Sequence, residues 1–293
     1  MTSPAADPPL PLARSLRLAG RDGVDLVADA YGDPAHPPVL LLHGGGQTRF
    51  AWGGTAQQLA ADGWHAVSMD LRGHGESAWA PDKDYSVDAF VDDVRAVVLQ
   101  LGAPPVLVGA SLGGIASLIA EGESHPSLAA ALVLVDIAPR IEASGALRII
   151  QFMAGRPEGF ASLDEAADAV AAYLPHRRRP SDLGGLAKNL RRMPDGRWRW
   201  HWDPAFLEPG HGPRPGQDTD RMRAAARRLR VPTLLVRGRL SDLLSEEGAR
   251  DFLALVPHAR FADVSDAGHM VAGDRNDRFT AAVLGFLREL GPA

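Results

Sequence analysis

The chain has 293 residues and no cysteine, and its 31 lysines and arginines against 36 aspartates and glutamates leave a formal net charge of −5. The missing cysteines exclude disulfide bonds, thiolate metal sites and a cysteine nucleophile, and the negative charge argues against a nucleic-acid partner. The first thirteen residues contain four prolines and no apolar stretch suited to a signal peptide or membrane span, so we expect a cytoplasmic protein without a membrane partner.

The first half of the chain alternates between short apolar runs and helical patterns. A hairpin is expected at 14–32, with its turn at Gly20 to Gly23. Buried strands are then expected at the run "PPVLLL" and at 65–71, 105–110 and 130–136, with helices at 54–63, 87–101 and 112–121. Because strand–helix–strand alternation makes crossover connections, the pattern predicts an α/β fold with a mostly parallel central sheet flanked by helices.

The alternation stops after Pro139. Helical patterns occupy 143–154, 163–173 and 184–192, and the Pro/Gly linker "EPGHGPRPGQD" follows. Strand patterns resume at 232–238 and 260–264, before a last helix at 278–290. We therefore predict a core made of residues 1–138 and 216–293, interrupted by a helical cap at 139–215. Ligands bind at the carboxyl ends of parallel strands, so the cap is expected to roof that edge.

The stretch "GASLGG", residues 109–114, places Ser111 in a G-x-S-x-G pattern between a predicted strand and a predicted helix. Glycines remove the Cβ atoms that would collide in so tight a turn, which leaves the serine hydroxyl exposed above the sheet. Ser111 is therefore the predicted nucleophile. The structural alternative is a serine that only caps a helix near loop glycines.

A serine nucleophile needs a base that is held by an acid. His269 in "DAGHMV", between the last strand and the last helix, is the predicted base, with His43 and His74 as alternatives. Asp242 follows a buried strand and is the predicted acid, in the chain order Ser, Asp, His. Asp136, which ends the strand at 130–136, is the rival for this role.

The stretch "HGGGQT", residues 43–48, suits an oxyanion hole, in which backbone amides bind a developing negative charge. We expect the amides of Leu112 and Gly45 to serve there, with Gly46 less favoured. Gly46, Trp52 and Trp200 are candidate pocket residues, although tryptophan can equally pack the small lobe on the core. No residue cluster has metal-ligand spacing, so we expect neither a metal nor another cofactor.

Five motifs carry a family resemblance that spans residues 15–290: "LLHGGG", "DLRGHGES", "GASLGG", "GRLSD" and "DAGHM". With them, the chain resembles a serine member of the α/β-hydrolase superfamily with a helical cap. Capped epoxide hydrolases and haloalkane dehalogenases carry aspartate where this chain has Ser111, which argues against both. The resemblance leaves carboxylesterases, lactonases, carbon–carbon bond hydrolases, perhydrolases and macrolide esterases.

The expected activity is hydrolysis of a carboxylic ester or lactone, including a macrocyclic lactone, through an acyl-enzyme. The expected binding partner of the protein is a small-molecule substrate. Carbon–carbon bond hydrolysis, perhydrolysis or acyl transfer on the same triad is the alternative within enzymes. A ligand receptor that retains a hydrolase site is the alternative from another class, because one fold hosts many functions.

Overall fold

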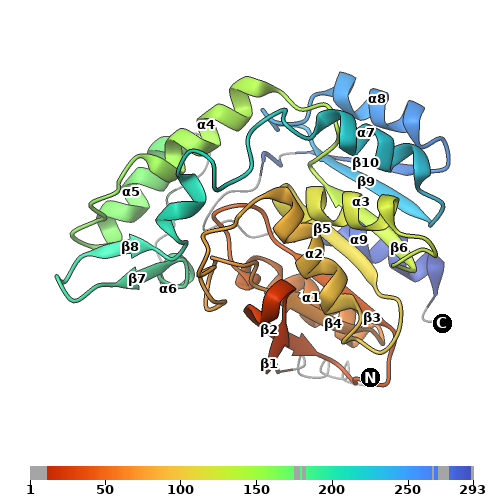
Figure 1. Ribbon diagram of the computed structural model, residues 1–293, viewed down its shortest axis with the longest axis horizontal. Coiled ribbons are helices and arrows are strands. Elements are labelled where there is room, and N and C mark those ends of the chain that lie inside the picture. The colour runs from red at the N-terminus through yellow and green to blue at the C-terminus, as the bar shows by residue number, and fades with distance from the viewer. Residues whose placement is uncertain (1–11, 175–178, 180–182, 266, 270–276, 292–293) are drawn as a thin grey trace, which may run out of the picture.

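The computed structural model describes residues 12–174, 179, 183–265, 267–269 and 277–291, and an eight-stranded sheet runs through it (Figure 1). The strand order is β1-β2-β4-β3-β5-β6-β9-β10. The bounds are β1 (Arg14–Ala19), β2 (Asp25–Tyr31), β3 (Pro38–Leu42), β4 (His65–Met69), β5 (Val106–Ala110), β6 (Ala131–Val135), β9 (Thr233–Gly238) and β10 (Arg260–Val264). β1 and β2 pair antiparallel, β2 joins β4 antiparallel, and the remaining pairs are parallel, which confirms the predicted fold class.

Helices cover both faces of this sheet. One face carries α1 (Gly53–Ala61) and α9 (Asp277–Leu290), and the other carries α2 (Val87–Val98), α3 (Leu112–Glu123), α7 (Thr219–Arg228) and α8 (Glu246–Leu255). Alternate residues of a central strand belong to different apolar clusters: Leu40 and Leu42 pack with the second group of helices, whereas Val39 and Leu41 pack with α1 and α9. Burial on both faces explains why these strands are continuous apolar runs.

The segment between β6 and α7 departs from the sheet and forms a separate lobe beside it (Figure 1). It contains α4 (Ala143–Ala154), α5 (Leu163–Tyr173), α6 (Gly184–Ala187), a hairpin of β7 (Leu190–Arg192) and β8 (Trp198–Trp200), and the 3-10 helix η3 (Pro204–Leu207). The bounds of α4 and α5 match the predicted helices. The predicted helix at 184–192 is wrong after Ala187, because the chain turns there and pairs Leu190 with Trp200 in the hairpin.

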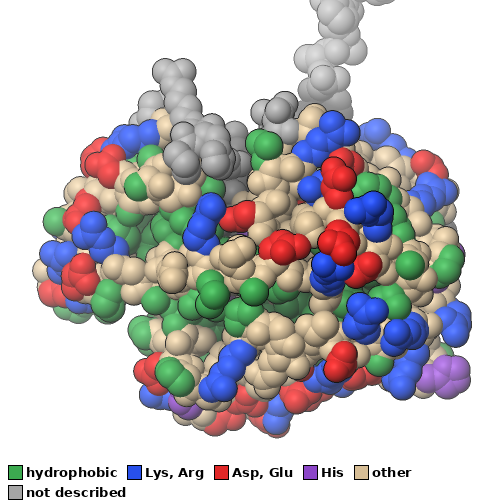
Figure 2. Space-filling view, turned by 90° about the horizontal axis from the view of Figure 1, so that it is seen from above, with side chains coloured by type: hydrophobic (Ala, Val, Ile, Leu, Met, Phe, Trp, Pro, Cys, Tyr) green, Lys and Arg blue, Asp and Glu red, His purple; other side chains and the backbone are tan. Residues whose placement is uncertain are grey.

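Two further 3-10 turns, η1 (Arg21–Gly23) and η2 (Arg49–Trp52), complete the elements. On the face shown in Figure 2, hydrophobic side chains gather in a recessed region between the lobes, and charged side chains occupy much of its margin. Among the described residues, we found no helix whose length and apolar character would allow it to span a lipid bilayer.

Candidate active site

Ser111 stands at the junction between β5 and α3 in a backbone conformation that L-amino acids rarely adopt. Its φ is 45° and its ψ is −114°, directly after Ala110 ends the strand and before Leu112 begins the helix. Positive φ in a residue other than glycine costs roughly 1–3 kcal/mol and is found preferentially at functional sites. The turn therefore has the strained geometry that the G-x-S-x-G pattern predicts.

The glycines around Ser111 allow three backbone segments to touch. A Cβ at Gly109 would lie 2.5 Å from the carbonyl oxygen of Gly113, and one at Gly113 would lie 2.6 Å from that of Leu42 in β3. A Cβ at Gly114 would lie 2.4 Å from Cγ2 of Ile137. Larger residues would push α3 away from the sheet, so the glycines set the position of the serine.

His269 is held by Asp136 through a short hydrogen bond. Its Nδ1 lies 2.7 Å from Oδ2 of Asp136, and the side chains of both residues are almost completely buried. Asp136 directly follows β6 and has a φ of 54°. Because Nδ1 donates its hydrogen to the carboxylate, the proton of a neutral imidazole is held on Nδ1, and Nε2 is left as the nitrogen that can accept a proton.

The carboxylate of Asp136 receives two further hydrogen bonds from the loop after β9. The amide of Gly238 donates to Oδ1 at 3.1 Å, and the hydroxyl of Ser241 donates to Oδ2 at 2.6 Å. Donors therefore contact both oxygens of this buried carboxylate and fix its orientation. Ser241 escaped the sequence analysis, because a serine in "GRLSD" has no signal of its own.

The prediction that Asp242 is the partner of His269 is wrong. Its carboxylate lies 3.1 Å from Nη1 of Arg148 on α4. In the turn after β9, the side chain that faces the histidine–aspartate pair is that of Ser241, one residue earlier. Consecutive side chains in a turn point in different directions, so Asp242 is directed toward the cap. Asp136, the rival in the sequence analysis, occupies the expected place of the acid.

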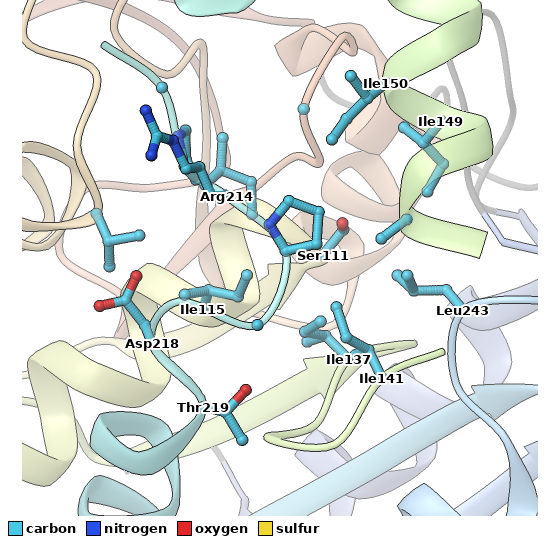
Figure 3. Close-up of a pocket in the computed structure, with 18 of the residues that line it drawn as sticks. Ser111, Ile115, Ile137, Ile141, Ile149, Ile150, Arg214, Asp218, Thr219 and Leu243 are labelled. Atoms are coloured by element: carbon cyan, nitrogen blue, oxygen red, sulfur yellow. The ribbon is translucent and has the colours of Figure 1, made fainter. Parts of the chain in front are cut away.

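Ser111 and His269 open into the same cavity, which has a volume of about 370 Å³ (Figure 3). This volume lies near the lower end of the range for small-molecule sites. Most of the wall is aliphatic, and its residues come from both the sheet domain and the separate lobe. Its members include Ile115, Ile137, Ile141, Ala146, Ile149, Ile150, Met153, Met222 and Leu243.

The loop after β3 leaves one backbone amide available at the cavity. The amide of Gly44 donates to Oε1 of Gln47 at 3.0 Å, that of Gly46 donates to Nε2 of His74 at 3.1 Å, and that of Gln47 donates to the carbonyl of Gly44 at 3.1 Å. Within the part of the chain that the structure describes, the amides of Gly45 and Leu112 have no such acceptor, and both residues line the cavity. This pattern suits the expected pair of oxyanion donors.

His43 and His74 are buried structural histidines. Nε2 of His43 accepts a hydrogen bond from the amide of Leu71 at 3.0 Å, and its Nδ1 donates to the carbonyl of Gly44 at 2.8 Å. Nδ1 of His74 donates in the same way to the carbonyl of Arg72 at 2.9 Å. Burial lowers the pKa of His43 to about 4 and that of His74 to about 3. Since both ring nitrogens of each are engaged, neither competes with His269 as the base.

The three candidate pocket residues do not belong to the cavity wall, and these predictions are wrong. Gly46 is not among the lining residues, and its amide donates to Nε2 of His74. Trp52 is fully buried in the apolar cluster beneath α1 and α9. Trp200 stacks on Trp202, with ring centroids 5.0 Å apart. The aromatic contacts of Trp200 therefore lie within the small lobe itself and not between that lobe and the core.

The Pro/Gly linker proves to be a wall of the cavity. Pro209, Pro213, Arg214 and Asp218 of the linker line it, and Thr219 follows at the start of α7 (Figure 3). Proline restricts the backbone of this segment, which makes it a firm surface. The sequence predicts only a linker at 208–218, because nothing in its composition indicates that its side chains face a cavity.

The comparisons with known proteins agree with this geometry. A family model described as the alpha/beta hydrolase fold matches residues 37–275. Esterase Rv0045c of Mycobacterium tuberculosis is 31% identical over 259 residues, which cover 86% of this chain and 83% of that protein. The 3-hydroxybutyrate-oligomer hydrolase of Cupriavidus necator is 29% identical over 252 residues, with coverage of 82% and 85%.

A solved structure shows the same architecture. An alpha/beta hydrolase from Novosphingobium aromaticivorans aligns with a TM-score of 0.80 at 27% identity, covering 94% of this chain and 98% of that one. The esterase relatives support an enzyme that hydrolyses esters. The strand order, the family match and these relatives together show that this chain belongs to the α/β-hydrolase family.

Proposed function

We propose that this protein is a serine hydrolase that cleaves a carboxylic ester or lactone through an acyl-enzyme on Ser111, His269 and Asp136. The observation that carries the proposal is the 2.7 Å contact between His269 and Asp136 at a cavity that Ser111 also lines. A histidine oriented by a buried carboxylate, in the same cavity as a serine on a strained turn, is the set of groups that can activate a hydroxyl.

The reaction proceeds in two stages. Nε2 of His269 takes the proton as the Ser111 hydroxyl attacks the carbonyl carbon, and the amides of Gly45 and Leu112 bind the resulting oxyanion. The intermediate collapses, and His269 gives the proton to the departing alkoxide. Water then attacks the acyl-enzyme by the same route and releases the acid. With a lactone, the alcohol stays attached to the acyl group until this second stage.

The cavity wall supports a substrate with an aliphatic part. Isoleucine side chains approach from the core at Ile115 and Ile137 and from α4 at Ile149 and Ile150. Apolar contact of this kind favours binding by roughly 25 cal/mol for each Å² of surface removed from water. In this proposal residues 139–215 form a cap over the core and shape the site for a small-molecule ester.

Replacement of the nucleophile tests the proposal. We expect Ser111→Ala to lower kcat on a p-nitrophenyl ester by about four orders of magnitude or more, because no other group supplies the attacking oxygen. Ser124→Ala, at the other end of α3, is the matched control and should keep its activity. A fluorophosphonate probe should label the wild-type protein at Ser111, as mapped by peptide mass spectrometry. Wild-type turnover by Ser111→Ala would refute the proposal.

A further inference from the structure

Ser241 lies beside the proposed triad and has no role in it so far. Its Oγ is 2.6 Å from Oδ2 of Asp136, the same oxygen that lies 2.7 Å from Nδ1 of His269. An ionised carboxylate only accepts hydrogen bonds, so the serine and the histidine both donate to this one atom. The hydroxyl is thus in direct contact with the oxygen on which the orientation of the imidazole depends.

The direction of this hydrogen bond follows from the other partners of the hydroxyl. The amides of Leu243 and Leu244 both donate to Oγ of Ser241, each at 3.1 Å. A hydroxyl has two lone pairs and one proton. Because the two amides occupy the lone pairs, the proton is directed to Asp136.

The turn that carries Ser241 is also attached to the loop that carries His269. The amide of Ser241 donates to the carbonyl of Gly238 at 3.0 Å, which closes the turn, and the amide of Leu240 donates to the carbonyl of Ala267 at 2.8 Å. A Cβ on Gly238 would lie 2.5 Å from that same carbonyl oxygen, so the two loops pack tightly. The hydroxyl therefore has a defined position relative to both members of the pair.

We infer that Ser241 is a positioning residue, whose hydroxyl holds the Asp136 carboxylate in the orientation that receives the His269 imidazole. This inference rests on the proposed function, since it concerns the same triad. The χ2 torsion of an aspartate is broad, so a carboxylate needs external contacts to remain in one orientation. The Gly238 amide holds Oδ1, and Ser241 holds Oδ2 independently of the histidine.

The expected effect of Ser241→Ala is a change in kcat. Without the hydroxyl, the carboxylate supports the developing imidazolium less well in the transition state, whereas the cavity keeps its wall. We expect kcat on a p-nitrophenyl ester to fall about tenfold, as for loss of a hydrogen bond to a charged group, and KM to stay within about twofold. Asp242→Asn is the matched control in the same turn and should retain the wild-type kcat.

A double-mutant cycle with Asp136→Asn separates positioning from a purely structural role. If Ser241 acts through the carboxylate, Ser241→Ala should change kcat by less than about twofold in the Asp136→Asn background. An equal loss in both backgrounds would show that the serine only shapes the turn, and would overturn the inference. If Ser241→Ala does not fold, the same double-mutant cycle is measured with Ser241→Cys. Cysteine has nearly the shape of serine, but its thiol is a weaker hydrogen-bond donor.

The two proposals fail in different ways. Ser111→Ala is measured beside the cycle, and wild-type turnover by that variant would remove the proposed function itself. An inactive Ser111→Ala together with an unaltered kcat for Ser241→Ala would overturn only the role of Ser241.

Discussion

Ser111 and Asp136 share a strained backbone although they have different functions. Each has a positive φ, 45° and 54° respectively, and each directly follows a central parallel strand. The sheet holds both residues in place: the amide of Ser111 donates to the carbonyl of Val135 at 3.2 Å, and that of Asp136 donates to the carbonyl of Val236 at 2.7 Å. Hydrogen bonds to neighbouring strands offset the cost of the strain and bring the hydroxyl and the carboxylate to one edge.

At this scale the acid of the triad can be tested directly. We expect Asp136→Asn to lower kcat by about three to four orders of magnitude, because an amide cannot stabilise the imidazolium or hold the required tautomer of His269. Asp242→Asn should change kcat by less than about threefold, since that carboxylate faces Arg148 on the partly exposed rim. The two variants are compared by their initial rates on the same p-nitrophenyl ester. If only Asp242→Asn lost activity, the acid of the proposed triad would be Asp242 and not Asp136.

At the scale of elements, helix α4 of the separate lobe forms part of the cavity wall. Ile149 and Ile150 contribute to the cavity from this helix, and Gly145 at its first turn packs against the loop after β9. A Cβ at Gly145 would lie 2.1 Å from the carbonyl oxygen of Asp242. The start of the helix is therefore fixed to the core, and its later turns set the width of the cavity.

Narrowing the cavity from α4 should change which esters are accepted. Ile149→Trp adds volume to the wall, so we expect kcat/KM for an octanoate ester to fall at least about tenfold and that for the acetate to change less than about threefold. Leu147→Trp is the matched control, because Leu147 lies on the same helix with 52% of its surface exposed and does not line the cavity. An equal loss for both esters would show that the acyl chain binds elsewhere.

At the scale of the whole molecule, a column of three buried histidines connects the sheet domain with the separate lobe. His43, His74 and His201 follow one another with ring centroids 5.3 Å and 5.7 Å apart. Nδ1 of His201, from the cap, accepts from the amide of Gly75 at 2.6 Å, while His74 holds Gly46 beside the oxyanion loop. Burial also lowers the pKa of His201 well below its usual value, so the column is uncharged at neutral pH.

This column should make the fold sensitive to mild acid. The pKa of His74 is about 3 in the folded chain and about 6.5 when unfolded, so below pH 6.5 the unfolded state binds the proton first and stability falls with pH. Between pH 7 and pH 5 one such histidine removes about 2 kcal/mol of unfolding free energy. Denaturant unfolding at the two pH values measures this loss for the native chain.

The variant His74→Gln isolates the contribution of one ring. Glutamine can accept from the amide of Gly46 and donate to the carbonyl of Arg72, but it does not titrate. The loss of stability between pH 7 and pH 5 should therefore be smaller in the variant by about 2 kcal/mol. An unchanged loss would mean that other groups govern the response to acid.

Much of the architecture could be predicted because its signals are local. Strands buried on both faces appear as continuous apolar runs, and α4 and α5 have the expected bounds because their apolar residues recur at helical spacing. The tight turn at Ser111 could equally be predicted, since it requires glycines at fixed offsets. The predicted helix through Arg192 failed because pairing with Trp200 lies outside the local pattern.

The sequence by itself determined the sheet class and the tight turn at Ser111, since these signals are local, and it left His269 as the preferred base beside His43 and His74. Only the tertiary structure decided that Asp136 rather than Asp242 meets His269, that Ser241 donates to the same carboxylate oxygen, and that a proline-rich connector lines the cavity. These outcomes depend on the directions in which side chains leave separate loops. The packing of distant segments sets those directions, and no pattern along the chain encodes them.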